Sequence, residues 1–208
     1  MLTSLPLSDF LNETASGSPA PGGGSVSALA ASLGAALASM VCRLTIGKKK
    51  YADVQSEMEN ILMQSEALRS QFIALIDEDT SAFNKVMAAY GLPKETDEQK
   101  ASRLTEIQAA MKSATFVPLN LMGLCIESLK LVKILVDKGN QNSISDAGVA
   151  ALMLQAGCEG AALNVNINLA SLIDTDFIEQ TKTKCGQYHA SLKIITSDIL
   201  DCVRKHEV

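Results

Sequence analysis

Between residues 53 and 90 the apolar side chains recur every three or four residues, and neither proline nor glycine interrupts them. This spacing places them on one face of an α-helix, because an α-helix turns once every 3.6 residues. A helix this long needs partners of similar length to cover its apolar face, so the pattern predicts a bundle of long helices. The apolar face consists of Val54, Met58, Ile61, Leu62, Leu68, Phe72, Leu75, Ile76, Phe83, Val86, Met87 and Tyr90.

The same periodicity and its start and stop signals predict five further helices. Gly47 should end one helix in a left-handed turn, and Pro118 should kink or split another. Leu104 lies in phase on the apolar face of the helix that contains Pro118. No segment alternates as a strand does, so the chain is predicted to be all-α, a single-domain bundle of about six helices over residues 1–208. The five ranges are 7–15, 25–44, 97–137, 146–169 and 175–205, with Ser25 as the N-cap of the second.

The composition agrees with closely packed helices, since 47% of the residues are apolar but only 4% are aromatic. Residues 25–40 are mostly Ala, Ser, Gly and Leu, with small side chains on every face of the predicted helix. Other helices can approach such a slim helix from several sides. We therefore expect it at the centre of the bundle or at a subunit interface, and we expect the chain to form a homodimer.

Charge and cysteine content exclude several classes of protein. The net charge of −5 disfavours nucleic-acid binding, because a phosphate backbone needs clustered lysine and arginine, and 48–50 is the one dense basic cluster. The stretch Val26–Ile46 is long enough to span a membrane, but its small residues and Arg43 give it little drive into lipid. Five scattered cysteines without a Cys-x-x-Cys pair indicate reduced thiols and a cytoplasmic location. His189 and His206 stand alone, so we expect no metal site.

The most informative single position is Asp79, a carboxylate on the apolar face of the helix over residues 53–90. It follows Leu75 and Ile76 by one turn and precedes Phe83 by one turn. Burial raises the pKa of a carboxyl group, and a raised pKa suits an acid/base catalyst near neutral pH. The alternative is an inward aspartate that pairs with a basic residue of a neighbouring helix.

Four other features each have two interpretations, one as a ligand contact and one as a purely structural element. Amides at the start of the second helix can hold an anion, or the glycines form a flexible turn. Polar residues near 142–146 can bind a ligand or cap a helix, and the amides at 164 and 168 can line a pocket or tie helices together. The basic cluster can bind an anion or complement the end of a helix. The candidate residues are Gly22, Gly23, Gly24, Ser25, Lys48, Asn142, Asp146, Asn164 and Asn168.

Several short segments follow one another in an order found in one known family. They are Pro19–Ala28, Met40–Val41, Leu44–Lys49, Asp79–Phe83, Leu92–Lys94, Ala114–Leu119, Gly139–Asn140, Ser145–Asp146 and Asn164–Leu169. Together they resemble the formiminotransferase-cyclodeaminase C-terminal family, over nearly the whole chain. The resemblance implies an all-α homodimer that binds a folate near the subunit interface, with no tightly bound cofactor and with a tetrahydrofolate derivative as substrate. The resemblance does not decide whether the chain acts together with a formiminotransferase partner.

The resemblance also implies one of two reactions. A cyclodeaminase closes 5-formimidoyl-tetrahydrofolate to 5,10-methenyl-tetrahydrofolate and releases ammonia, whereas a cyclohydrolase interconverts 5,10-methenyl- and 10-formyl-tetrahydrofolate. We expect the cyclodeaminase, with Asp79 as the acid/base and Asp146 as a second catalytic candidate. The glycine-rich amides or Lys48 would hold the carboxylates of the folate's glutamate tail. A helical dimer that binds folate without turnover is the alternative from another class.

Overall fold

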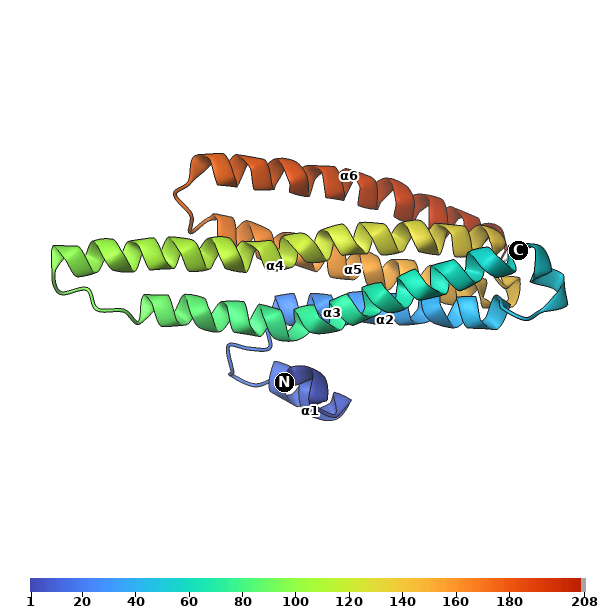
Figure 1. Ribbon diagram of the computed structural model, residues 1–208, viewed down its shortest axis with the longest axis horizontal. Helices are drawn as coiled ribbons and strands as arrows, with labels where there is room; N and C mark the ends of the chain where they lie inside the picture. Colours follow the sequence, from blue (N-terminus) through green and yellow to red (C-terminus); the bar gives the residue numbers. More distant parts are fainter. Residues whose placement is uncertain (207–208) are drawn as a thin grey trace.

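The computed structural model describes residues 1–206 and shows five long helices and one short helix in an elongated bundle (Figure 1). Helices α2 to α6 run up and down along the same axis, and the short α1 lies below α3 in this view, with Phe10 buried in the core (Figure 1). No strand occurs among the described residues. The all-α bundle predicted from periodicity is therefore confirmed. The helices are α1 (Leu7–Thr14), α2 (Gly23–Thr45), α3 (Gln55–Tyr90), α4 (Asp97–Lys138), α5 (Ile144–Leu169) and α6 (Thr175–Lys205), with 3-10 turns at Leu2–Ser4, Lys49–Val54 and Gln141–Ser143.

Helix α2 lies in the core and packs closely against α5, which runs in the opposite direction. A methyl group on Gly34 would lie 2.7 Å from the Leu154 side chain, and one on Gly157 would lie 2.8 Å from the Ser27 carbonyl oxygen. Such an approach is available only to glycine, which explains the small residues of both helices. The 18-residue windows of α2 include one apolar enough to span a membrane, and 61% of that window is buried inside the bundle.

The third and fourth helices extend beyond the other long helices at the turn that joins them (Figure 1). Here they pack mainly on each other, so one side of each faces solvent. Met87, Tyr90 and Leu104 were predicted to face the core, but they are 52%, 42% and 49% exposed. Helical phase was right along most of the bundle and wrong where the bundle narrows to two helices.

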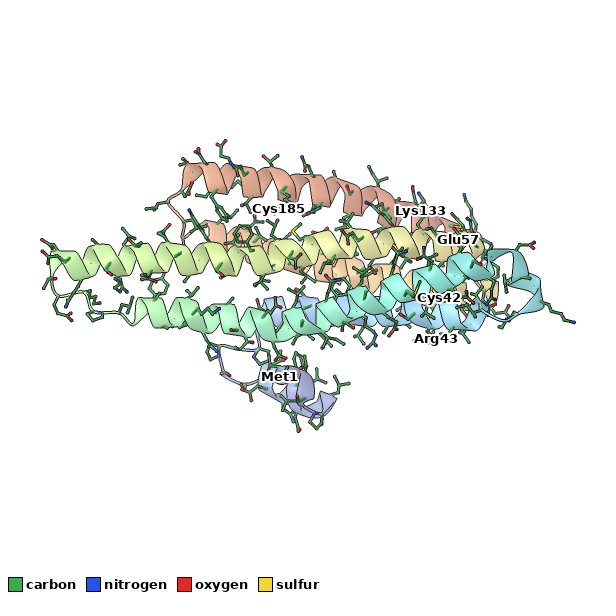
Figure 2. The ribbon with its side chains drawn as sticks, viewed as in Figure 1. Met1, Cys42, Arg43, Glu57, Lys133 and Cys185 are labelled. Carbon is green, nitrogen blue, oxygen red and sulfur yellow. The ribbon has the colours of Figure 1, made fainter. Side chains whose placement is uncertain are left out.

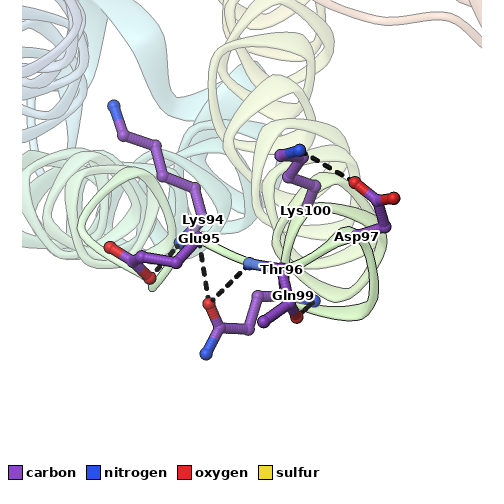
Figure 3. A network of polar contacts seen from close by, with 6 residues as sticks. All are labelled: Lys94, Glu95, Thr96, Asp97, Gln99 and Lys100. Carbon is purple, nitrogen blue, oxygen red and sulfur yellow. Dashed lines mark hydrogen bonds and ion pairs between the residues drawn. The ribbon is translucent and has the colours of Figure 1, made fainter.

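A capping box fixes the start of α4 at this turn (Figure 3). The Thr96 hydroxyl accepts a hydrogen bond from the Gln99 amide at 3.2 Å, and the Gln99 side chain accepts one from the Thr96 amide at 3.2 Å. These two bonds satisfy backbone donors that would otherwise lack partners at the first turn of the helix.

Pro118 lies inside α4, yet the helix continues unbroken from Asp97 to Lys138. Proline has no N–H, so the carbonyl of Ala114, four residues earlier, loses its helical partner. The Asn168 side-chain amide of α5 donates to that carbonyl at 3.1 Å. Of the kink or split predicted at Pro118, the split does not occur, and α5 supplies the donor that the proline lacks.

Candidate active site

Asp79 lies on α3 where that helix meets the first turn of α2, and its carboxylate is partly buried. The fully buried Ser25 donates its hydroxyl to Oδ2 of Asp79 at 2.9 Å. Asp79 is not in an ion pair within the part of the chain that the structure describes, so the predicted alternative of a basic partner is not what holds it.

Burial raises the pKa of the Asp79 carboxyl group above its ordinary value. Hydrogen bonds from the hydroxyl and amide of Ser25 oppose this rise but do not cancel it. A carboxyl group with a raised pKa can both accept and donate a proton nearer to neutral pH than an exposed aspartate can. The structure thus supports the chemical character that the sequence predicted for this residue.

Gly24 makes the approach of Asp79 possible. A Cβ atom at position 24 would overlap Oδ1 of Asp79 and would lie 2.5 Å from its Cγ and 2.8 Å from Oδ2. Because the glycine has no side chain, the carboxylate lies against the first turn of α2, where backbone amides point outward and the helix dipole is positive. Asp79 therefore occupies the place of an N-cap side chain, which the actual N-cap, Gly22, cannot provide.

Ser25 does not cap α2, which corrects the sequence prediction. The helix begins two residues earlier, at Gly23, and Ser25 is its third residue. Its hydroxyl points to α3, where it also lies 3.0 Å from the Ile76 carbonyl oxygen and 3.4 Å from the Thr80 hydroxyl. The flexible glycine turn expected as the alternative is instead the helical first turn beside Asp79.

The two asparagines of α5 lie at the same end of the bundle as Asp79. Asn164 packs beside Gly23, where an added Cβ would lie 3.4 Å from Nδ2, and it donates to the Gly160 carbonyl at 2.8 Å. Asn168 is one turn further on and ties α5 to α4 through Ala114. Asn164 therefore belongs to the group around Asp79. The amide of Asn168 instead ties two helices together, which was the structural interpretation offered by the sequence.

Lys48, Asn142 and Asp146 lie at the opposite end of the bundle within one copy of the chain. Lys48 follows the end of α2, and the 23 residues of that helix span about 33 Å at 1.5 Å per residue. Figure 2 labels Arg43 and Glu57 at this end, and Met1 at the side of the molecule where α1 lies. One copy of the chain therefore unites Gly22, Gly23, Gly24, Ser25, Asp79 and Asn164. It leaves Lys48, Asn142 and Asp146 at the other end, and it engages Asn168 in a contact with α4.

A cleft of about 780 Å³ lies between α3 and the N-terminal segment, next to this group. Thr80 connects the two, since it lines the cleft and its hydroxyl lies 3.4 Å from that of Ser25. Sequence reasoning gave Thr80 no role, although it lies within the segment that carried the resemblance. The cleft is lined on α3 by Asp77, Thr80, Ser81, Asn84, Lys85 and Ala88, which recur with helical spacing.

The five cysteines are unpaired, and no cluster of three or more His, Cys, Asp or Glu side chains suited to a metal ion occurs within residues 1–206. The candidate site is therefore built from one carboxyl group, hydroxyl groups, an amide side chain and a helix N-terminus.

Comparison with known proteins places these features in context. A family model described as formiminotransferase-cyclodeaminase matches residues 6–187. The chain is 51% identical to a methenyltetrahydrofolate cyclohydrolase from Methylorubrum extorquens, over 82% of each chain. It is 35% identical to a formimidoyltransferase-cyclodeaminase from Gallus gallus, over 99% of this chain and 38% of that protein. The chain thus spans little more than a third of that longer relative.

The fold is also similar to a solved structure. The crystal structure of formiminotetrahydrofolate cyclodeaminase from Thermotoga maritima superimposes with a TM-score of 0.90 and 30% sequence identity. The match covers 99% of this chain and 98% of that chain, so the whole bundle is shared.

Proposed function

Because the chain belongs to the formiminotransferase-cyclodeaminase family, we propose that it is an enzyme that rearranges a one-carbon group on tetrahydrofolate, with Asp79 as the group that moves protons. The observation that carries this proposal is the position of Asp79. Its carboxyl group has a raised pKa, lacks a cationic partner among the described residues, and is held by Ser25 at a helix N-terminus.

The first candidate reaction is that of a methenyltetrahydrofolate cyclohydrolase, which the 51% identity over 82% of both chains favours. Water adds to the cationic methenyl carbon, and the Asp79 carboxylate accepts one of its protons. The resulting tetrahedral carbon holds a hydroxyl group between N5 and N10. Its bond to N5 then breaks, N5 takes a proton, and the hydroxyl loses its proton to become the carbonyl oxygen of 10-formyl-tetrahydrofolate.

The second candidate is the cyclodeaminase reaction, favoured by the relatives and the solved structure that carry this name. Here N10 attacks the carbon of the protonated formimidoyl group (–CH=NH2+) on N5, so that its nitrogen becomes an amino group, and Asp79 accepts the N10 proton. The same carboxyl group then protonates the amino nitrogen, which leaves as ammonia while the methenyl bridge closes. Both reactions pass through a tetrahedral carbon between N5 and N10, and both need one group that accepts and then donates a proton.

The proposed enzyme acts as a homodimer through the outer face of α2 and α5. This face is apolar and unpartnered in a single copy, and Gly23–Met40 carries no charged residue. Burying such a face against a second copy removes it from water. Its exposed members are Val26, Leu33 and Leu44 on α2, and Val149, Leu152, Leu163 and Ile167 on α5.

A twofold axis through the middle of this face would reverse the helix direction in the second copy. The end with Lys48, Asn142 and Asp146 would then approach the Asp79 end of the other copy. This arrangement accounts for candidates that a single copy holds about 33 Å apart. In it, Lys48 of one copy pairs with the folate carboxylates, and Asp79 of the other moves the protons.

Complementation between two inactive variants tests this shared site. We expect Asp79→Asn and Lys48→Ala each to lose turnover, and their refolded mixture to regain about a quarter of wild-type activity, because half the dimers are mixed and each mixed dimer has one intact site. No recovery in a mixture shown to contain mixed dimers would place both residues in the same copy or remove Lys48 from the site.

The reaction itself is tested by supplying two substrates to the purified wild-type chain and following methenyl absorbance. Loss of 5,10-methenyl-tetrahydrofolate faster than in buffer identifies the cyclohydrolase. Its formation from 5-formimidoyl-tetrahydrofolate identifies the cyclodeaminase. Inactivity toward both substrates, in a folded chain whose melting temperature rises with folate, would instead leave a folate-binding dimer without catalysis.

A further inference from the structure

The Ser25 hydroxyl has more acceptors than it has hydrogens. It lies 2.9 Å from Oδ2 of Asp79 and 3.0 Å from the carbonyl oxygen of Ile76, and both distances suit a hydrogen bond. A serine hydroxyl carries one hydrogen and two acceptor lone pairs. When Asp79 is ionised and can only accept, the two oxygens compete for the single hydrogen of Ser25.

We propose that the Ser25 hydroxyl is a two-position switch that follows the protonation of Asp79. With Asp79 ionised, Ser25 donates its hydrogen to Oδ2. With Asp79 protonated, the carboxyl group donates its own hydrogen to Oγ of Ser25, and Ser25 turns its hydrogen to the Ile76 carbonyl. The heavy atoms stay in place, and the hydrogen of the hydroxyl rotates about the Cβ–Oγ bond.

The switch matters because the Ser25 hydroxyl is buried. Ser25 is completely buried, so water cannot replace a partner that its hydroxyl loses. The Ile76 carbonyl lies inside α3 and accepts the helical bond from the Thr80 amide, so it can give up the hydrogen of Ser25 without becoming unpaired. Ser25 can therefore satisfy Asp79 in both protonation states, while the carboxyl group stays in one position.

As a statement about catalysis, this inference rests on the proposed function. A carboxyl group that accepts and then donates a proton in one turnover must be stable in both forms at the same site. Ser25 is thus a positioning residue that acts through Asp79 and not on the folate.

Among the groups around Asp79, Ser25 is the main hydrogen-bonding partner that a substitution can remove. From α2, the segment Gly23–Met40 offers no titratable side chain, and from α5 the facing residue is Asn164. On α3, Glu78 is exposed, and Asp77 is bound by the Leu2 amide and the Thr3 hydroxyl. Glu13, Lys85 and the N-terminal residue Met1 line the neighbouring cleft.

The switch predicts that the Ile76 carbonyl senses the charge of Asp79. We would label the full chain with ¹³C at isoleucine carbonyls and ¹⁵N at aspartate amides, which selects the two Ile–Asp pairs at 76–77 and 173–174. A second sample, labelled with ¹³C at the aspartate side-chain carboxyl carbons, gives the titration of Asp79, and we expect the Ile76 carbonyl resonance to move with pH at the same midpoint. The pair at 173–174 lies beyond α5 and should not share that midpoint.

Asp79→Asn distinguishes this effect from titration of the neighbouring Asp77. In that variant the Ile76 step should vanish, although Asp77 is still present. A step that persists in Asp79→Asn, or an Ile76 resonance that ignores the Asp79 titration in the wild type, would overturn the switch. Both measurements use only the wild type and Asp79→Asn, so they require neither a folded serine variant nor turnover.

Ser25→Ala provides the second test. Without the hydroxyl, ionised Asp79 loses a charge-assisted hydrogen bond, so its midpoint should move to a pH about one unit higher. Ser32→Ala is the matched control, since Ser32 is a buried serine of α2 whose hydroxyl donates to the Leu29 carbonyl at 2.8 Å. An unchanged Asp79 midpoint in folded Ser25→Ala would contradict the inference. Absence of wild-type turnover on both folates would overturn the proposed function but would leave this result unaffected.

Discussion

Gly24 and Asp79 form a matched pair, because the carboxylate of Asp79 fills the space that any side chain at position 24 would need. The two residues belong to different helices, and their contact joins the beginning of α2 to the middle of α3. The glycine is thus required by the carboxylate rather than by the backbone of the helix.

Gly24→Ala should displace Asp79 and reduce activity at least tenfold, with a loss of stability of about 1–3 kcal/mol from overpacking. The methyl group would overlap Oδ1 of Asp79, and α2 cannot retreat because α5 packs on its other side. Steady-state kinetics and urea denaturation measure the two effects. Gly186→Ala on α6 is the control, since no atom lies within 4 Å of its added methyl group, and it should retain full activity.

Asp79→Asn should make the folded chain more stable than the wild type at pH 7, and this difference in stability should become smaller in acid. Burial raises the pKa of Asp79 in the folded state above its unfolded value, so the folded state binds the proton more tightly. The wild type therefore loses stability as pH rises from about 4 through the folded pKa. We expect a gain in stability for the variant at pH 7 that shrinks toward pH 4 in urea denaturation. A gain independent of pH would contradict this origin.

The sequence predicted much of the fold because helical periodicity reports which residues are buried. It also placed Asp79 on a buried face, since the residues one turn before and after it are apolar. Periodicity does not report which helix a residue faces. Ser25 and Asp79 are 54 positions apart, so their hydrogen bond depends on how α2 and α3 pair.

Other differences have local physical causes. Glycines at 23 and 24 favour a loop in a local pattern, but in the fold they form the first turn of α2 and admit the Asp79 carboxylate. The helix therefore starts earlier than the cap signal at Ser25 predicted. Pro118 signals a kink or a break, but α4 continues through it, and the Asn168 amide of α5 donates to the carbonyl that the proline leaves without a helical partner. Both cases are tertiary effects that a local pattern does not contain.

Asn168→Ala should cost about 1–3 kcal/mol of stability, because it leaves the buried Ala114 carbonyl without a donor. Adding Pro118→Ala to this variant restores a backbone N–H to the same carbonyl and should recover part of the loss. Denaturant unfolding of the wild type, both single variants and the double variant gives the coupling energy. Additive effects of the two substitutions would show that the amide and the proline do not share this carbonyl.

Leu33→Glu should convert the proposed homodimer to a monomer. Leu33 lies on the outer face of α2 and is 50% exposed in a single copy, so a second copy would bury the new charge. Sedimentation equilibrium measures the mass. Ile194→Glu on α6, where the isoleucine is 64% exposed, is the matched control and should leave the dimer intact. A wild-type chain that sediments as a monomer would refute the proposed interface.

Asp79 is proposed to move the protons in a folate reaction. The most direct test of this role compares turnover of wild type and Asp79→Asn on 5,10-methenyl- and 5-formimidoyl-tetrahydrofolate. Both proteins would first be shown to fold and to associate alike. We predict that the wild type turns over at least one substrate and that the variant loses a factor of about 10² to 10⁴, the usual contribution of a general acid/base. A folded Asp79→Asn variant with wild-type turnover would contradict the account.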